Sequence, residues 1–320
     1  MRFAQTALFA AALLADFAAA QSLLVLNKEG SLAIVDAATR KVVGRVPTGE
    51  SPHEVVASTD GKLAFTSNYG GTTPGNTISV IDLAAQKERR LDLGSLRRPH
   101  GLWFADGKLY FTAETNKLIG RYDPASNQID WLLGTGQNST HMVLVTPDTS
   151  LIFTANIGSD SITMIERAGL QNWNETAIPV GKGPEGFDLS PDGKQIWAAN
   201  SQDGSVSVID VSTKKVVQTF GVQTQRSNRL KFTPDGRLVL ISDLGGGELV
   251  VLERATKKVV KRMKLGRSPA GILIEPDSSR AYVAVTGDND VAVIDLRTLD
   301  LQARIQTGTG PDGMAWVPKR

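Results

Sequence analysis

The sequence repeats itself at intervals of 41 to 47 residues, and this period constrains the fold more than any other feature. Each unit starts at a loop position, runs through an apolar strand to a tight turn, and continues through further short strands. Repeats of about 40–45 residues built from four strands are typical of β-propeller blades. No long segment has the 3.6-residue period of a helix, which excludes a helical solenoid. The units start at Pro52, Pro99, Thr140, Pro184, Ser227, Pro269 and Pro311.

The two ends of the repetitive region are fragments that complete each other. Residues 310–318 contain a first strand with nothing after it, whereas residues 22–49 contain three strands that lack a first strand. Pairing of the two ends would close the ring and remove the exposed sheet edges. We therefore predict an all-β fold over residues 21–320, a single seven-bladed β-propeller of four-stranded antiparallel blades, closed by its N- and C-terminal segments.

Residues 1–20 have the pattern of a signal peptide. Arg2 supplies the positive charge, residues 7–15 form a short apolar run, and Ala18-Ala19-Ala20 matches a cleavage site. The apolar run has about half of the roughly 20 residues that span a bilayer, and no later segment resembles a membrane span. We expect cleavage near Ala20 and an exported protein, either periplasmic or extracellular.

Composition excludes several kinds of site. The chain has no cysteine, which removes disulfides, thiolate metal sites and thiol nucleophiles, and we find no haem motif. Residues 181–186 and 308–313 fit G-x-G-x-x-G, but both lead into a strand rather than a helix, so we expect no nucleotide. The net charge is +2, and the basic segment 254–267 has no interleaved aromatic residues, so we expect no nucleic-acid partner.

All three histidines of the chain occupy one repeat position. Alignment of the unit starts places His53, His100 and His141 in three consecutive blades, with Glu185 at this position in the fourth. Because the first strand of a blade lies nearest the axis, these side chains are expected at the mouth of the central tunnel. Three imidazoles and a carboxylate suit one divalent transition metal of unknown identity. The alternative is that the histidines are structural and hydrogen-bond to neighbouring loops.

Other polar residues are expected on the same face. Glu54 and Glu114 are candidate catalytic carboxylates for general-base work. Glu114 is aligned there with Asn68 at the loop between the second and third strands. Arginine forks suit carboxylate or phosphate groups, so we predict a small anionic or oxygen-rich ligand such as a sugar acid or lactone. The candidate ligand-binding residues are Arg98, Asn228, Arg229 and Asp312.

The second strands of four units share a motif, Phe65-Thr66-Ser67-Asn68 and its counterparts at 111–114, 153–156 and 197–200. Over residues 22–318 the chain resembles the YVTN-repeat propellers, a group that includes YncE-like exported proteins, and it is similar to lactonase-type seven-bladed propellers. The second resemblance implies a metal-assisted hydrolase or lyase acting on a lactone or sugar-derived substrate. Because a fold does not fix an activity, catalysis stays open. The alternative is a non-catalytic scaffold that binds a protein, a cell-envelope component or a polyanion.

Overall fold

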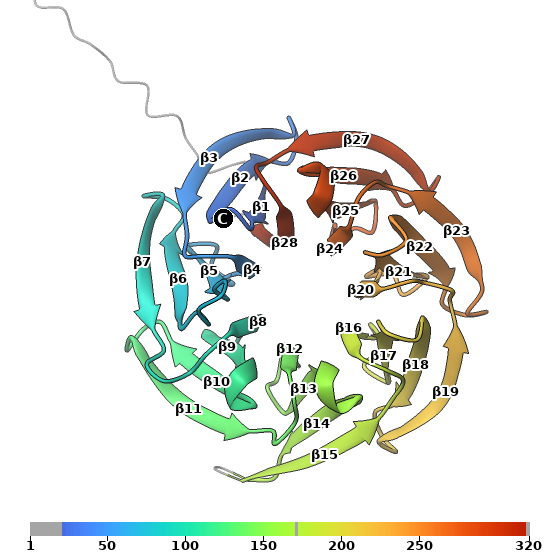
Figure 1. The fold of residues 1–320 in the computed structure, drawn as a ribbon, viewed down its shortest axis with the longest axis horizontal. Helices are drawn as coiled ribbons and strands as arrows, with labels where there is room; N and C mark the ends of the chain where they lie inside the picture. The colour runs from blue at the N-terminus through green and yellow to red at the C-terminus, as the bar shows by residue number, and fades with distance from the viewer. Residues whose placement is uncertain (1–20, 170–171, 318–320) are drawn as a thin grey trace, which may run out of the picture.

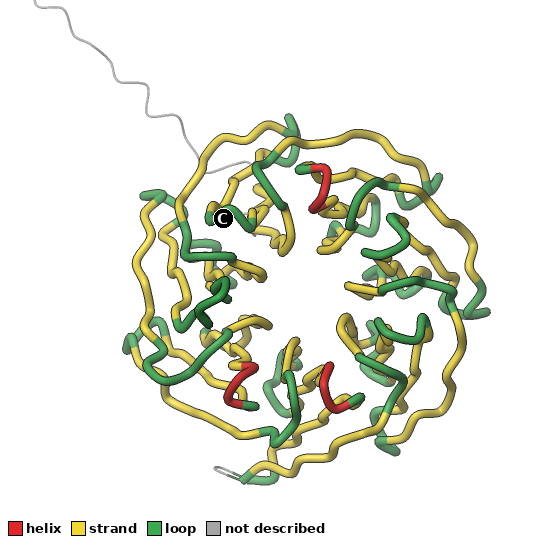
Figure 2. The backbone as a smooth tube through the Cα atoms, viewed as in Figure 1, coloured by secondary structure: helices red, strands yellow, loops and turns green. Residues whose placement is uncertain are grey.

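The computed structural model describes residues 21–169 and 172–317, so the predicted signal peptide lies outside the described residues. Its strands form seven four-stranded antiparallel sheets arranged around a central axis (Figure 1). This arrangement confirms the predicted seven-bladed propeller. Helical structure in the described residues is limited to short 3-10 turns near the ends of strands (Figure 2), and none of these helices is long and apolar enough to cross a membrane.

The innermost strand of every blade begins at the unit start that the sequence predicts. These strands are β4 (Pro52–Ala57), β8 (Pro99–Ala105), β12 (Thr140–Val145), β16 (Pro184–Leu189), β20 (Ser227–Phe232), β24 (Pro269–Ile274) and β28 (Pro311–Val317). The second strands are β5 (Leu63–Asn68), β9 (Lys108–Ala113), β13 (Leu151–Asn156), β17 (Gln195–Asn200), β21 (Leu238–Asp243), β25 (Arg280–Val285) and β1 (Ser22–Asn27).

Two further layers complete each blade toward the outside. The third strands are β6 (Thr77–Asp82), β10 (Leu118–Asp123), β14 (Ser161–Arg167), β18 (Ser205–Asp210), β22 (Glu248–Glu253), β26 (Asp290–Asp295) and β2 (Ser31–Asp36). The outer strands are β7 (Lys87–Asp92), β11 (Gln128–Gly134), β15 (Trp173–Pro179), β19 (Lys215–Gly221), β23 (Val259–Lys264), β27 (Asp300–Gln306) and β3 (Lys41–Pro47). The 3-10 turns are η1 (Glu114–Asn116), η2 (Ile157–Ser159) and η3 (Thr286–Asp288).

The ring closes as predicted by pairing of the two ends. Strand β1 pairs with β28 in antiparallel register, with Leu24 opposite Ala315 and Val25 opposite Met314. The same strand pairs with β2 on its other side, so both of its edges are hydrogen-bonded. The side chains of β1 from Leu23 to Leu26 are fully buried. Closure therefore leaves no unpaired edge on this strand.

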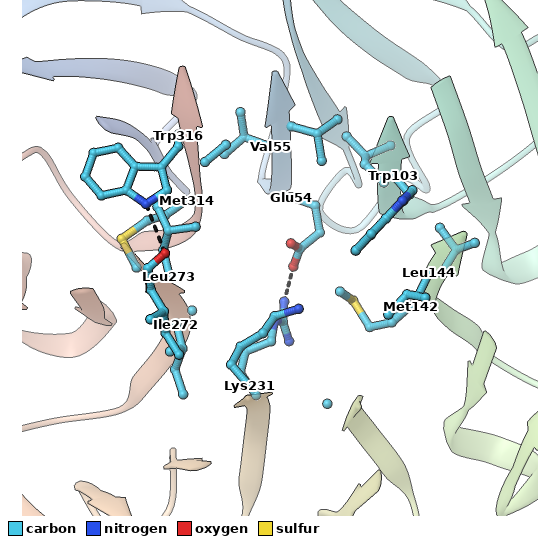
Figure 3. A pocket seen from close by; sticks show the side chains of 18 of the residues that line it. Glu54, Val55, Trp103, Met142, Leu144, Lys231, Ile272, Leu273, Met314 and Trp316 are labelled. Carbon is cyan, nitrogen blue, oxygen red and sulfur yellow. Dashed lines mark hydrogen bonds and ion pairs between the residues drawn. The ribbon is translucent and has the colours of Figure 1, made fainter. Parts of the chain in front are cut away.

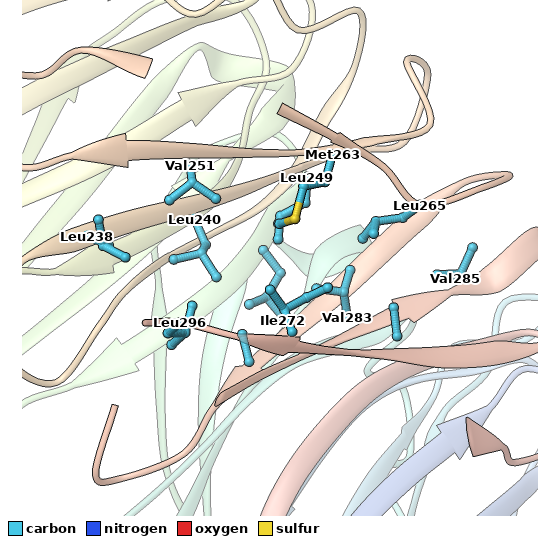
Figure 4. Close-up of a cluster of buried hydrophobic side chains, with 13 residues drawn as sticks. Leu238, Leu240, Leu249, Val251, Met263, Leu265, Ile272, Val283, Val285 and Leu296 are labelled. Carbon is cyan, nitrogen blue, oxygen red and sulfur yellow. The ribbon is translucent and has the colours of Figure 1, made fainter. Parts of the chain in front are cut away.

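The core consists of apolar layers between neighbouring blades. Second and third strands are covered on both faces, and for this reason they read as near-continuous hydrophobic runs such as Leu238-Val239-Leu240-Ile241. Between the β20–β23 blade and the β24–β27 blade, Leu240 and Leu249 pack with Ile272 and Val283 (Figure 4). Along the outer strands, exposed residues alternate with partly buried ones, as expected where one face of a strand meets water.

A β-bulge interrupts every innermost strand just after its first residue. In β4, Pro52 pairs with Asn68 and Val55 with Thr66, so both His53 and Glu54 lie opposite Ser67. The other six innermost strands have a register shift at the same place. Bulges re-aim side chains at the rims of barrels and next to functional sites. Here the bulge turns the residues that follow each unit start toward the tunnel.

The next level around the tunnel has glycine in four blades and a large residue in the other three. A Cβ on Gly101 would lie 2.6 Å from the His141 carbonyl oxygen, and one on Gly186 would lie 2.5 Å from the Arg229 Cα. Glycine therefore permits the close approach of the next blade at these positions. Glu54, Met142 and Arg229 occupy this level in other blades and line the tunnel cavity.

Candidate functional site

A cavity of about 560 Å³ opens at the mouth of the tunnel, where the innermost strands begin. We call it the histidine pocket. It brings together seven of the residues selected from the sequence, namely His53, His100, His141, Glu185, Asn228, Arg229 and Asp312. All of these are buried except His53, which is partly exposed. The shared repeat position therefore places these side chains around one cavity.

The three imidazoles form a row with an aromatic neighbour. The rings of His100 and His141 stack with their centroids 3.6 Å apart and an interplanar angle of 29°. His53 lies 4.9 Å from the His100 ring, and Tyr69 makes an edge-on contact with His100 at 5.5 Å. The row therefore runs across three consecutive blades, with stacked rings at His100 and His141 and a tilted ring at His53.

Glu114 fixes the orientation of His141. The His141 Nδ1–H donates to Glu114 Oε1, and the Tyr69 hydroxyl donates to Glu114 Oε2 at 2.6 Å. A carboxylate that holds Nδ1 leaves Nε2 as the second hydrogen-bonding atom of the ring. The His141 ring is therefore held in one orientation by a partner at the pocket wall.

The strand register explains why Glu114 reaches His141 although it does not line the pocket itself, and it corrects the sequence alignment. Pro99 pairs with Ala113, whereas Pro52 pairs with Asn68, so Ala113 is the true counterpart of Asn68. Glu114 follows one residue later, at the start of η1. Asn68 is buried and hydrogen-bonds to Gly49, Thr77 and Ser79 around its own loop. Glu114, past the end of the strand, is free to contact His141.

The carboxylates inside the pocket are already paired with protein donors. Glu185 accepts a hydrogen bond from the Asn228 amide, and its Oε1 lies 4.0 Å from His141 Nε2. Asp312 Oδ2 forms an ion pair with Lys28 Nζ at 3.1 Å and lies 3.5 Å from His53 Nδ1. Lys28 was not selected from the sequence, because its loop position carries no motif.

Glu54 and Arg229 form an ion pair that crosses the tunnel from opposite blades. Arg229 lines both the histidine pocket and a second cavity deeper in the tunnel, whereas Glu54 lines only the second one. Figure 3 shows Glu54 in this second cavity. The ion pair therefore forms a partition between the two cavities. Glu54, selected as a candidate catalytic residue, lies in this partition.

Arg98 supports the pocket wall from behind. Its guanidinium lies 4.6 Å from the centre of the Tyr69 ring and donates to the Gly71 carbonyl at 3.3 Å. It is not among the residues that line the pocket, whereas the neighbouring Tyr69 is. Tyr69 begins a glycine-rich loop, and that loop was the one available sequence signal for it.

Burial determines the ionisation of the pocket. Burial lowers the pKa of His53 to about 4, although Asp312 acts in the opposite direction. Burial, together with the neighbouring His141, holds the pKa of His100 well below its usual range. Burial opposes the charged form of Asp312, but Lys28 and His53 outweigh it, so the pKa of Asp312 is lowered. His53 and His100 are therefore neutral at pH 7.

Burial and neighbouring groups also determine the pKa values of two further carboxyl groups, those of Glu114 beside His141 and of Glu54 in the partition. Burial acts to raise the pKa of Glu114, but the hydrogen bonds from His141 and Tyr69 outweigh it, so that pKa is lowered. Burial raises the pKa of Glu54, and the attraction of Arg229 offsets this only in part. Glu114 is therefore held as an anion, while Glu54 depends on Arg229 for its charge.

The side chains predicted to hold a metal were tested against this geometry. Within residues 21–169 and 172–317, no group of three or more His, Asp or Glu side chains is placed to hold a metal ion. The reason lies in the stacking, because lone pairs in the planes of two stacked rings run side by side and do not converge. The metal ion stays a prediction.

Two ring nitrogens in the pocket lack a partner. Among the described residues, His100 Nδ1 and His141 Nε2 are buried and make no hydrogen bond. Buried polar atoms are nearly always hydrogen-bonded, so each exception needs an explanation, such as a bound group. Both atoms belong to residues that line the same cavity.

Comparisons with known proteins agree with this architecture. A family model described as YNCE-like β-propeller matches residues 97–280. A search of curated proteins found no significant match. The fold is similar to that of the periplasmic gluconolactonase of Pseudomonas aeruginosa, with a TM-score of 0.75, 17% identity, and coverage of 94% of this chain and 99% of that one.

Two further solved structures have the same fold. A candidate 6-phosphogluconolactonase from Bacteroides uniformis has a TM-score of 0.76 at 16% identity, over 93% of this chain and 99% of that one. The hydrazine synthase of Kuenenia stuttgartiensis has a TM-score of 0.71 at 21% identity, over 84% of this chain and 90% of that one. At these identities the similarity shows the fold alone.

Proposed function

The chain belongs to the YNCE-like β-propeller family, and from this premise we propose that its histidine pocket binds a small oxygen-rich molecule such as a sugar acid or its lactone. The observation that carries the proposal is the pair of buried, unpartnered nitrogens, His100 Nδ1 and His141 Nε2. A neutral imidazole has one donor and one acceptor nitrogen, and a hydroxyl group can satisfy either. A polyhydroxylated molecule would supply both partners at once.

The charged groups of the pocket suit a ligand that carries many oxygens. Lys28 is paired with Asp312, and Arg229 is paired with Glu54. Arg226 also lines the pocket, and none of the ion pairs among the described residues involves it, so it can pair with a carboxylate of the ligand without breaking an existing ion pair. Glu185 and Asn228 are hydrogen-bonded to each other, and their remaining polar atoms can bind hydroxyl groups of the ligand.

Hydrolysis of a lactone is the candidate activity that the wall of the pocket favours. The supporting observation is that Glu114 holds one nitrogen of His141, while the other is buried without a hydrogen-bond partner in a residue that lines the cavity. This arrangement positions a water molecule for attack on a carbonyl in many hydrolases. Solved structures described as gluconolactonases share the fold, which makes lactones the first substrates to test.

Binding is tested by calorimetry with D-gluconate, freshly dissolved D-glucono-1,5-lactone and the uncharged D-glucitol. We expect saturable one-to-one binding of at least one compound and a loss of at least about tenfold in affinity for each of His100→Ala and His141→Ala. Thr66→Val is the matched control, because Thr66 Oγ1 is also buried and unpartnered but is not among the pocket-lining residues. The same lactone samples report turnover when ring opening is followed.

Two results would contradict the proposal. One is the absence of binding for all three compounds. The other is an equal loss of affinity in Thr66→Val and in the histidine variants, which would show that the effect is not local. Elemental analysis of the same wild-type samples, beside the triple alanine variant of His53, His100 and His141, separately tests the metal prediction.

A further inference from the structure

The second cavity in the tunnel is a separate chamber with its own chemistry. It has a volume of about 430 Å³ and is formed by the middle and C-terminal parts of the innermost strands. The Glu54–Arg229 pair divides it from the histidine pocket. Cavities of about 300–1,000 Å³ hold most small-molecule ligands. We call this space the tunnel chamber.

The walls of the tunnel chamber are apolar. Large side chains that line it are only partly buried. Figure 3 shows them around the cavity, and they include Trp103, Met142, Leu273, Met314 and Trp316. Exposed apolar surface of this kind is stabilised when a hydrocarbon ligand removes it from water.

The aromatic walls are held in place before any ligand enters. Trp316 Nε1–H donates to the Ile274 carbonyl at 3.1 Å, and its ring makes an edge-on contact with Tyr282 at 5.4 Å. The Lys231 ammonium lies 5.9 Å from the centre of the Trp103 ring. Preformed walls lower the entropy cost of binding. The thioether side chains of Met142 and Met314 can adapt to the shape of a ligand.

The charged groups of the tunnel chamber are all neutralised by the protein. Glu54 and Arg229 pair with each other, and Lys231 pairs with Asp188 at 3.4 Å. Asp188 also accepts the Phe232 backbone N–H at 3.0 Å. An ionic ligand would therefore find no unpaired counter-charge, and it would lose its own hydration on entering. Charge complementarity thus favours a neutral occupant.

We propose that the tunnel chamber binds one neutral, predominantly hydrocarbon small molecule between Trp103 and Trp316, at a site separate from the histidine pocket. The chamber supplies apolar contact area, two fixed indole rings and no free charge. The proposal does not depend on the ligand of the histidine pocket.

The test uses the full mature chain and the neutral fluorescent probe N-phenyl-1-naphthylamine. We expect saturable binding with a stoichiometry of one and energy transfer from tryptophan to the probe. Leu273→Gln makes the chamber wall polar at nearly constant volume, and Ala57→Phe fills part of the chamber. Each should weaken binding by at least about tenfold, which corresponds to about 1.4 kcal/mol.

Leu301→Gln is the matched control, because it makes the same substitution at an exposed leucine on the outer strand β27. It should bind the probe as the wild type does, and melting temperatures identify any variant that has not folded. The anionic probe 1-anilinonaphthalene-8-sulfonate should bind more weakly than the neutral probe.

Three results would overturn the proposal. They are no saturable binding to the wild type, equal binding by folded Leu273→Gln and Leu301→Gln, and tighter binding of the anionic probe. The first two would remove the site, and the third would show that the chamber selects a charged ligand.

Discussion

Removal of one partner of the tunnel partition should destabilise the protein far more than removal of both. The side chains of Glu54 and Arg229 are only 12% and 7% exposed. In Glu54→Gln the guanidinium would stay charged, because arginine does not lose its proton in proteins. Its remaining hydrogen bonds go to the carbonyl and side-chain oxygens of Asn228, at 3.4 and 3.3 Å. Asp312 and Glu185 also attract this guanidinium, so the loss should lie near the lower end of the roughly 3–5 kcal/mol of a broken buried pair, at about 3 kcal/mol.

Removal of Arg229 instead of Glu54 should cost less stability, because the carboxyl group that is left behind can become neutral. Burial already raises the pKa of Glu54, and loss of the Arg229 charge in Arg229→Met would raise it further. The protonated form then avoids a buried charge, and the loss falls to the roughly 1–3 kcal/mol of an unsatisfied polar group. A group with a raised folded-state pKa stabilises the fold at low pH, so this deficit should shrink as the pH falls from 7 to 5.

Equilibrium urea denaturation measures these differences, with the double variant Glu54→Leu/Arg229→Met as the reference. Replacement of both charges by apolar groups is often neutral or stabilising, so the double variant should lie within about 1 kcal/mol of the wild type or above it. Two outcomes would refute the reasoning. One is a loss below about 1 kcal/mol in Glu54→Gln, and the other is a larger loss in Arg229→Met than in Glu54→Gln.

Three further predictions follow from other parts of the fold. Gly271→Ala should lower the free energy of unfolding in urea by at least about 2 kcal/mol, because its Cβ would lie 2.0 Å from the Asp312 carbonyl oxygen. Gly134→Ala is the control, because a Cβ there would meet no atom within 4 Å, and it should cost under about 0.5 kcal/mol. Equal losses in the two variants would contradict the account. The Ser58 hydroxyl and the Lys62 backbone N–H lower the pKa of Asp60 to about 2 from 3.8, so the melting-temperature gap between wild type and Asp60→Asn should be widest above pH 4 and close toward pH 2. A gap that is constant with pH would count against those hydrogen bonds. Secreted protein should have a mature N-terminus at Gln21, which intact-mass measurement checks; retention of residues 1–20 would disprove the cleavage prediction.

The sequence repeat predicted most of the fold and part of the site. A period near 43 residues places every unit start at the first residue of an innermost strand, from Pro52 to Pro311. The same register brings His53, His100 and His141 to one end of the tunnel. Residues at the same repeat position lie at the same height in their blades, so the sequence alone was sufficient to predict that these residues lie close together.

Side-chain direction could not be predicted in this way. The bulge turns His53 to the histidine pocket and the next residue, Glu54, to the partition, although the two are adjacent in the chain. A one-residue difference in register brings Glu114 against His141. Lys28 comes from a loop, whose conformation depends on tertiary contacts that no local pattern records.

The stacking of the imidazoles could not be predicted from the sequence either. Three histidines at one repeat position favour a shared ligand, but the distance between neighbouring blades allows His100 and His141 to lie face to face. Each of the two rings then keeps one buried nitrogen that makes no hydrogen bond among the described residues. The repeat predicts which residues meet, and the packing of the blades determines how they meet.

The most direct test of the proposed function is to observe the imidazole nitrogens by long-range ¹H–¹⁵N NMR with and without D-gluconate or its lactone. The chain has only three histidines, so single substitutions assign every signal. We predict that bound ligand shifts the signals of His100 Nδ1 and His141 Nε2 most, while Nδ1 of His141 keeps its hydrogen bond to Glu114. Unchanged signals for all three histidines at saturating concentrations of both compounds would contradict the account.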